Sequence, residues 1–466
     1  MKKRKLFLND NAASSLESSS FFIGINLSSN LRKLEASLIG TSGSGKDAPI
    51  ILYKSVAFDL PDEVSQVFNE LKQCVPDPDL EAGDLSLEAQ GRFSPKKDSL
   101  SSKKLSSRAD NEETPASSSL AKLSNLRIMN TIVQEEAVLE LLKDVNVSKD
   151  NIIAIAVSDP GIWLFSTEWD HQQTFFSLSD SLALSRRTGL NVIDSLVPND
   201  AFLSRQGLLL FPYWILLGDS ERDKLIIDLG ETARWYYIPS SRNGIESTSK
   251  LLFDNTISCG SLLNLLTKQA SKGEFSIDVG GRLSVQGRCI NELVDFWREG
   301  ISDILISAKS DLLNPSLSQK IISETYYLKR LLSFNSRQKV SSVDALCSAV
   351  HMIADQIIES VREKDSFLTN QNYDVVLTGA SKQNGLLFSR LSSAIAPHGV
   401  HTLNEYGCFD EESFDSVALA VLGLLFTIGI PALLYKEGRL EKVMKGRLVF
   451  SSEVARNRMS AFQTGQ

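Results

Sequence analysis

The chain has 466 residues, 42% of them hydrophobic and 23% charged, which is typical of a soluble globular protein with two domains. A formal net charge of −8 excludes the basic surface on which nucleic-acid phosphates bind, so we expect no nucleic-acid partner. The five cysteines are scattered and odd in number, which excludes a disulfide framework or paired zinc ligands and fits a reducing, cytoplasmic compartment.

Residues 1–19 are predicted to form a disordered tail. Their basic stretch is not followed by an apolar run long enough for a signal peptide. A nuclear-localisation signal is the weaker alternative to a solvated tail.

Three strands are predicted next. Residues 21–25 and 35–39 indicate two strands joined by a turn, and residues 49–53 indicate a third. Residues 40–47 copy the glycine spacing and the lysine of a phosphate-binding loop, but Asp47 stands where a Ser or Thr should ligate magnesium. Because a strand follows instead of a helix, we interpret this segment as a hairpin turn.

A Ser-rich insertion interrupts the first domain. Residues 58–74 are predicted to be helical, and the following residues 76–121 are dominated by Ser, Lys, Asp and Glu. Such a segment buries too little apolar surface to order itself, so we predict a disordered insertion. A helix at residues 124–143 and a buried strand at 151–157 are then typical of a crossover unit.

Capping signals define a short helix before a second sheet begins. Ser179 and Asp180 are predicted to cap a helix that ends at Gly189. Residues 224–229 and 233–238 flank a Gly-Glu-Thr turn, which is typical of a hairpin.

Residues 372–391 form the most informative unit. A short apolar run at 375–377 predicts a buried strand, residues 378–381 a small-residue turn, and the spacing from Asn384 onward a helix. Such a turn can direct backbone amides and the positive end of a helix dipole into a cleft, where an anion binds. An ordinary strand–helix connection without a ligand is the alternative.

Residues 417–434 are uncharged over a length that suggests a membrane span. Gly429 and Pro431 divide the run, and acidic residues stand just before it. We therefore predict a buried helix followed by a strand at residues 431–435, and no membrane partner.

Taken in this order, the motifs resemble those of the anhydro-N-acetylmuramic acid kinase family, sugar kinases of the actin, hexokinase and Hsp70 superfamily. The similar segments are residues 188–193, 278–287, 404–407 and 415–422. The resemblance implies an α/β fold with two RNase H-like, actin-like ATPase lobes around a central cleft. It places the first lobe at residues 20–215 and the second at 216–435, with residues 436–466 packing back on the first. It also implies a possible homodimer.

The same resemblance implies ATP and magnesium as cofactors, and a 1,6-anhydro amino sugar whose anhydro bond is attacked by water during phosphorylation. The implied nucleotide-binding residues are Ser28, Ser29, Asn30, Gly230, Gly379, Ala380 and Ser381. Asp200 and Asp415 are the implied sugar contacts. The family's catalytic aspartate falls on Ser195, and the neighbouring Asp194 is the candidate base only if a bulge turns it toward the cleft.

Several groups of the family motifs are replaced in this chain. Arg32 stands at an acidic position and Ser28 at a glycine of the phosphate hairpin, so we assign no metal ligand. These losses favour a catalytically impaired protein that acts as a binding or regulatory module. One alternative is an active sugar kinase with re-sited carboxylates at Asp194, Asp228 or Asp254. Another is a scaffold that binds no nucleotide.

Overall fold

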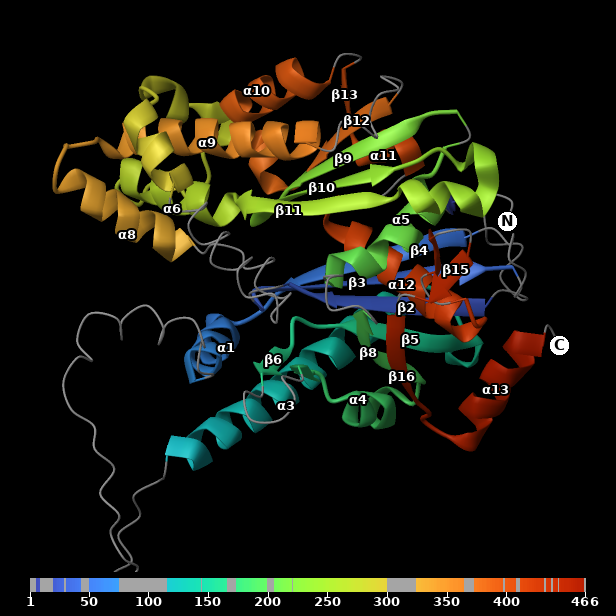
Figure 1. The fold of residues 1–466 in the computed structure, drawn as a ribbon. Helices are drawn as coiled ribbons and strands as arrows, with labels where there is room; N and C mark the ends of the chain where they lie inside the picture. Colours follow the sequence, from blue (N-terminus) through green and yellow to red (C-terminus); the bar gives the residue numbers. More distant parts are fainter. Residues whose placement is uncertain are drawn as a thin grey trace, which may run out of the picture.

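The computed structural model builds the chain around two β-sheets that face each other (Figure 1). The structure describes residues 6–8, 20–28, 31–42, 50–74, 115–143, 145–165, 173–198, 205–219, 221–299, 324–363, 373–396, 399–407, 411–430, 433–436, 439–442 and 444–464.

The first sheet consists of seven strands. They are β1 (Leu6–Leu8), β2 (Ser20–Leu27), β3 (Lys33–Thr41), β4 (Ile50–Asp59), β5 (Ile152–Ser158), β8 (Val192–Pro198) and β16 (Met444–Val449). Their order is β1-β4-β3-β2-β5-β8-β16. β2, β3 and β4 are antiparallel neighbours, whereas β5 runs parallel to β2 and β8 parallel to β5. The buried, unbroken apolar run of β5 is typical of a strand covered on both faces.

The second sheet repeats this pattern with five strands. They are β9 (Asp223–Leu229), β10 (Thr232–Ile238), β11 (Leu252–Ser258), β12 (Tyr373–Thr378) and β13 (Val400–His401). The order β11-β10-β9-β12-β13 matches β4-β3-β2-β5-β8 strand for strand, with the same antiparallel and parallel pairings. The two RNase H-like lobes that the resemblance implies are therefore present. Two small hairpins pair β6 (Ile162–Phe165) with β7 (Gln173–Phe176) and β14 (Leu433–Lys436) with β15 (Arg439–Lys442).

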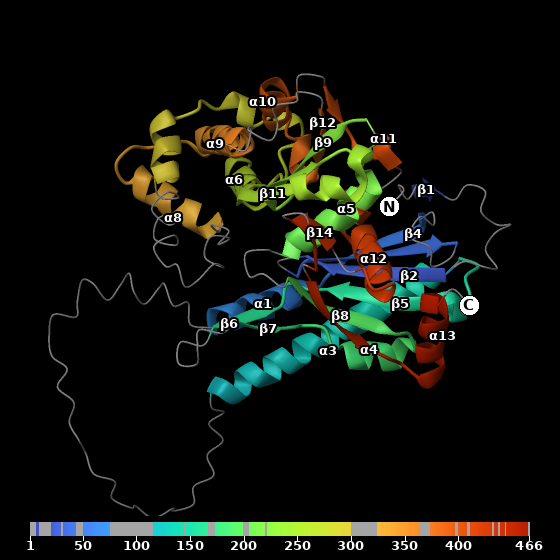
Figure 2. The same ribbon diagram turned by 45° about the vertical axis from the view of Figure 1, so that its right-hand side comes forward.

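Helices cover the outer face of each sheet (Figures 1 and 2). The bounds of all described α-helices are α1 Asp62–Cys74, α3 Pro115–Leu142, α4 Ser181–Thr188, α5 Leu210–Leu217, α6 Gly260–Ala270, α8 Glu324–Asn335, α9 Ser342–Glu363, α10 Gly385–Ile395, α11 Leu403–Gly407, α12 Phe414–Thr427 and α13 Glu453–Thr464, and residues 291–299 are also helical. Apolar residues of α1, α3 and α4 pack on the first sheet, and those of α6, α9 and α10 pack on the second. The helix predicted between Asp180 and Gly189 is confirmed as α4 with those two caps.

α5 and α12 form a layer between the two sheets. Through them, one apolar core joins Phe22 and Ile39 of the first sheet to Ile226 and Tyr236 of the second. A Cβ added at Gly24 would lie 2.0 Å from a carbonyl oxygen of α12, so the helix packs directly on the backbone of β2. Burial on all sides explains the uncharged run that was predicted to be a core helix. Among the described helices, none is both long and apolar enough to span a membrane.

The structure corrects three predicted boundaries. Leu6–Leu8 pair with β4 as strand β1, within the segment expected to be a disordered tail. The helix predicted from residue 58 begins at Asp62, because β4 continues to Asp59. α3 begins at Pro115, inside the predicted insertion, and the rest of that insertion lies outside the described residues. β3 and β4 pair antiparallel on either side of the segment interpreted as a hairpin turn.

The C-terminal segment returns to the first sheet. β16 pairs antiparallel with β8, and α13 contacts β5. α12 also packs on the first sheet, although it falls within residues 216–435 that were expected to form the second lobe. The division of the chain into lobes by residue number therefore stays a prediction.

Candidate functional site

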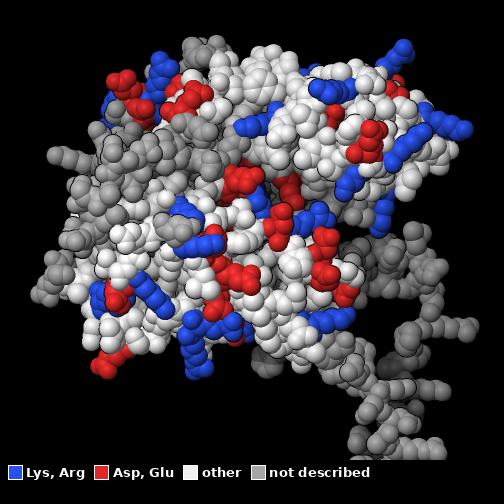
Figure 3. All heavy atoms as spheres, turned by 180° about the vertical axis from the view of Figure 1, so that it is seen from behind, with Lys and Arg blue, Asp and Glu red and all other residues white. Residues whose placement is uncertain are grey.

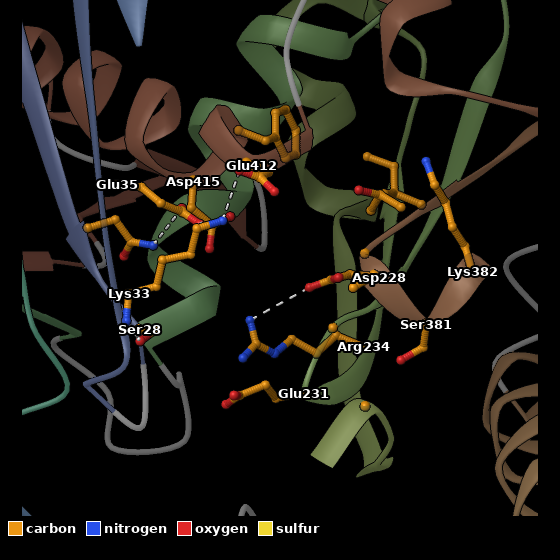
Figure 4. Close-up of a pocket in the computed structure, with 18 of the residues that line it drawn as sticks. Ser28, Lys33, Glu35, Asp228, Glu231, Arg234, Ser381, Lys382, Glu412 and Asp415 are labelled. Carbon is orange, nitrogen blue, oxygen red and sulfur yellow. Dashed lines mark hydrogen bonds and ion pairs between the residues drawn. The ribbon is translucent and has the colours of Figure 1, made fainter. Parts of the chain in front are cut away.

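A cavity of about 410 Å³ lies between the two halves. Its walls come from the β2–β3 turn, the β9–β10 hairpin, the turn after β12 and the start of α12. Acidic and basic side chains gather around the junction of the halves in Figure 3. The charged lining residues, most of them labelled in Figure 4, are Arg32, Lys33, Glu35, Asp228, Glu231, Arg234, Lys382, Glu412 and Asp415. Such a cavity suits a small polar molecule.

Glu35 on β3 is an acid of this cavity with a strongly raised pKa. Burial and, after it, the nearby Asp415 carboxylate raise the pKa of Glu35, whereas Lys33 and Asn26 lower it, and the net result is a pKa of about 7. Asn26 Nδ2 donates a hydrogen bond to Glu35 Oε2 at 3.4 Å, and Lys33 Nζ lies 3.6 Å from Oε1. Lys33 Nζ also lies 3.1 Å from Glu412 Oε2. Glu35 can therefore hold or release a proton near neutral pH.

Asp415 is held in the first turn of α12 by a buried tyrosine. The Tyr213 hydroxyl on α5 donates a hydrogen bond to Asp415 Oδ1. Burial and then the Asp415 carboxylate raise the pKa of Tyr213 well above its ordinary value, so its hydroxyl keeps its proton and donates. The Tyr213 ring stacks on Phe414 at 4.4 Å between centroids and meets Tyr236 edge-on. This packing fixes the Asp415 carboxylate at the cavity wall.

The second sheet contributes an arginine and an aspartate side by side. Arg234 on β10 is directly opposite Asp228 on β9, and Arg234 Nη1 lies 3.9 Å from Asp228 Oδ2. The Arg234 side chain is only 13% exposed. Figure 4 shows both side chains extending from the second sheet into the space between the halves. The Arg234 guanidinium therefore forms part of the cavity wall on this side, next to the Asp228 carboxylate.

The small-residue turn after β12 packs on the β9–β10 hairpin. Gly379 has a φ of 87°, and a Cβ there would lie 2.5 Å from a backbone carbon of β9 and 2.6 Å from the Gly230 nitrogen. The Gly230 carbonyl in turn accepts a hydrogen bond from Gly260 N at 2.9 Å, at the start of α6. Glycine at 379 is thus required by backbone packing between two turns, independently of any ligand.

The anion site expected at the start of α10 is not supported. Asn384 caps this helix, with its side-chain oxygen accepting from Leu387 N at 3.0 Å. Its side-chain nitrogen donates to buried Asp278 at 3.0 Å. A Cβ on Gly385 would lie 2.8 Å from the Gly280 carbonyl oxygen, so neighbouring backbone covers the helix end. Residues 378–383 line the cavity, but α10 does not.

A sequence profile of the anhydro-N-acetylmuramic acid kinase family matches residues 81–448. The chain belongs to this family. The curated anhydro-N-acetylmuramic acid kinase of Acaryochloris marina (strain MBIC 11017) is 22% identical over 250 residues, which cover 53% of this chain and 63% of that relative. The chain thus spans less than two thirds of the relative's length.

Solved structures align over most of the chain at low identity. An activator of 2-hydroxyisocaproyl-CoA dehydratase from Clostridium difficile with bound ADPNP is 8% identical at a TM-score of 0.34, covering 87% of this chain and 94% of that one. A ROK family glucokinase from Streptomyces griseus in complex with glucose and AMPPNP is 12% identical at a TM-score of 0.32, covering 86% and 99%. The family assignment rests on the sequence match alone.

Six residues that the family resemblance implies line the same cavity. They are Ser28, Gly230, Gly379, Ala380, Ser381 and Asp415. Three others, Ser29, Asn30 and Asp200, lie outside the described residues. The turns that the family motifs occupy therefore converge on one cavity, while the roles of their residues stay predictions.

Asp194 lies away from this cavity. β8 carries a bulge in which Ser195 and Leu196 face one residue of β16, and Ser195 has a φ of 50°. The bulge nevertheless leaves Asp194 pointing to α4, where the Ser181 hydroxyl donates to it. Arg447 grips the same carboxylate, with Nε 2.9 Å from Oδ1 and Nη2 2.5 Å from Oδ2. This arrangement disfavours the predicted role of Asp194 as a base.

The two other carboxylates proposed as a re-sited base, Asp228 and Asp254, differ in their position relative to the cavity. Asp228 lines the cavity. Asp254 does not, and it accepts a hydrogen bond from Ser360 Oγ at 2.8 Å.

Sequence reasoning missed Lys33, Glu35, Arg234 and Glu412 as cavity residues. A usable signal was present for Glu35, because it is an acid within an otherwise apolar strand with Lys33 two residues earlier. Glu412 carries no such signal, since only the approach of α12 to β3 brings it near Lys33.

Magnesium, which the family's kinase chemistry implies, does not fit the residues present. Within the described ranges, no three His, Cys, Asp or Glu side chains are grouped to hold a metal ion. Asp228 already has the Arg234 guanidinium beside it, and Arg32 stands at the acidic position of the phosphate hairpin.

Proposed function

We propose that this member of the anhydro-N-acetylmuramic acid kinase family binds a sugar in the cavity between its lobes and has little phosphotransfer activity. The observation that carries the proposal is a contrast between two sets of residues that the resemblance implies. Several of them line the cavity, whereas the implied base position supplies no carboxylate to it. The resemblance places the family aspartate at Ser195, and Asp194 is bound to Arg447 outside the lining residues. A binding or regulatory role then remains for the cavity.

The groups that phosphotransfer requires act together in the transition state. By the resemblance the base is replaced here, and the described residues of the cavity do not suit magnesium. Because such groups act as a unit, losing several leaves little rate above background. Membership in a kinase family still suggests ATP use, so nucleotide binding is tested separately from catalysis.

The sugar is favoured as ligand by the composition of the cavity wall. Asp415 is fixed by Tyr213, and Glu35 lies near it with a pKa of about 7. Carboxyl groups in fixed positions are suitable partners for sugar hydroxyls, which both donate and accept hydrogen bonds. The volume of about 410 Å³ falls in the range of small-molecule sites.

An active kinase with a re-sited base is the second candidate. Glu35 favours it, because a carboxyl group in the cavity with a pKa of about 7 has the properties of a general base. Among the carboxylates that the sequence hypothesis named, Asp228 also lines the cavity.

Incubating the full chain with magnesium ATP and anhydro-N-acetylmuramic acid, and measuring phosphorylated product, separates the two candidates. We expect no product above background but a rise in melting temperature with the sugar alone. Product formation that Glu35→Gln or Asp228→Asn abolishes would establish the second candidate instead. Glu136→Gln, on the exposed side of α3, is the matched control. Absence of a thermal shift with the sugar and with nucleotides would leave only a scaffold role.

A further inference from the structure

Described residues of the turn between β2 and β3 line the cavity, and two of their amides bond within the turn. Ser28 N donates to the Lys33 carbonyl at 2.9 Å, and Leu31 N donates to the Ser28 carbonyl at 3.0 Å. Leu31 adopts a positive φ of 54°. Ser28, Arg32 and Lys33 all line the cavity. Figure 4 places Ser28 on the first-sheet side, across from Ser381 and Lys382.

Two successive amides of this turn point at a single oxygen. Arg32 N and Lys33 N donate to Ser28 Oγ at 3.1 and 2.9 Å. Consecutive amides that converge in this way form a concavity for an anion. The hydroxyl accepts both bonds and so uses both of its acceptor sites. The Ser28 side chain therefore sits where a phosphate oxygen would bind.

The charge of the cavity wall also disfavours a bound phosphate group. Five acidic residues line the cavity against four basic ones. Lys33 is already paired with Glu412 at 3.1 Å and with Glu35 at 3.6 Å. Among the described residues, no three His, Cys, Asp or Glu side chains are grouped to hold magnesium, so a triphosphate entering here would meet carboxylates directly, which disfavours its binding.

We propose that Ser28 is a specificity-determining residue whose hydroxyl occupies the phosphate position of this turn, so that the cavity selects a sugar over a nucleotide. This inference rests on the proposed function and names its ligand class. Removing the hydroxyl frees two amides, whereas a threonine at this position keeps them occupied.

The test compares ADP binding by the full-length wild-type chain with that of Ser28→Ala, Ser28→Gly and Ser28→Thr, by titration calorimetry with and without magnesium. In Ser28→Ala and Ser28→Gly the two freed amides can donate charge-assisted hydrogen bonds to a phosphate of ADP. ADP binding should therefore be tighter by at least about tenfold in these two variants. Ser28→Thr should bind like the wild type. Equal ADP affinity in all four proteins, or tight binding by the wild type, would overturn the inference.

The sugar provides an independent readout. Affinity for anhydro-N-acetylmuramic acid is measured in the same four proteins, and Glu136→Gln, on the exposed side of α3, is the variant expected to bind the sugar like the wild type. If none binds the sugar, the proposed function fails while the ADP comparison still tests Ser28. If Ser28→Gly does not fold, Ser28→Ala decides the outcome, because it removes the hydroxyl and keeps the Cβ.

Discussion

Replacing Glu35 by glutamine should remove a pH dependence of folding stability. The pKa of Glu35 is about 7 in the folded chain, against an ordinary value of 4.5. From about pH 4.5 to 7 the folded state therefore keeps a proton that the unfolded state has lost, so stability falls as the pH rises. The stabilisation is complete below about pH 4.5 and gone above about pH 7. At about 1.4 kcal/mol per pH unit, the loss is about 3 kcal/mol.

Urea unfolding of the wild type and of Glu35→Gln at about pH 5 and about pH 8 measures this loss. Glutamine is close to the protonated acid in size and carries no charge, so the variant should gain about 3 kcal/mol relative to the wild type between the two conditions. The charged groups that face Glu35 are Asp415 and Lys33, and they are common to both proteins. Glu136→Gln, which changes an exposed acid, should follow the wild type.

Parallel stability curves for the wild type and Glu35→Gln would show that Glu35 ionises normally. A wild type that gains stability relative to the variant as the pH rises would give the effect the opposite sign. Either result would refute the account of a proton-holding carboxyl and remove Glu35 as a candidate base.

Three further substitutions, one of them with a matched control, test contacts that hold the fold together. Arg447→Ala leaves Asp194 buried without its cation. The substitution should lower the free energy of unfolding by about 2 kcal/mol, which is less than for a fully buried ion pair because the Arg447 side chain is 59% exposed. An unchanged urea midpoint would contradict the ion pair. Gly379→Ala should cost at least about 2 kcal/mol. Gly399→Ala, also at positive φ but with nothing within 4 Å, should cost less, and equal losses would refute the packing constraint. Gly24→Ala should abolish soluble expression, since its Cβ would lie 2.0 Å from α12, and a stable purified variant would disprove this contact.

The local patterns of the chain were sufficient for the fold and for the turns of the site. Apolar runs predicted the strands that became β2, β5, β9 and β12, and capping residues predicted α4. These signals lie within a few residues of one another, so they can be recognised without knowing the tertiary fold.

The functions of individual side chains depended on contacts between distant segments. Asp194 is one residue from the family's base position, yet Arg447, 253 residues away, determines what its carboxylate does. Glu35 has a raised pKa because α12 packs on β3, which buries the Glu35 carboxyl group and brings the Asp415 carboxylate near it. Burial and neighbouring charge set a pKa, and no local pattern of residues encodes either.

The sequence by itself determined individual strands and helices, because periodicity and turn residues act over short stretches, and the resemblance of its motifs gave the two α/β lobes and the family. Only the tertiary structure decided which carboxylates line the cavity and that the Ser28 hydroxyl occupies the β2–β3 turn. Those outcomes depend on where side chains point and on what covers them, which is fixed only when the two sheets and α12 pack together.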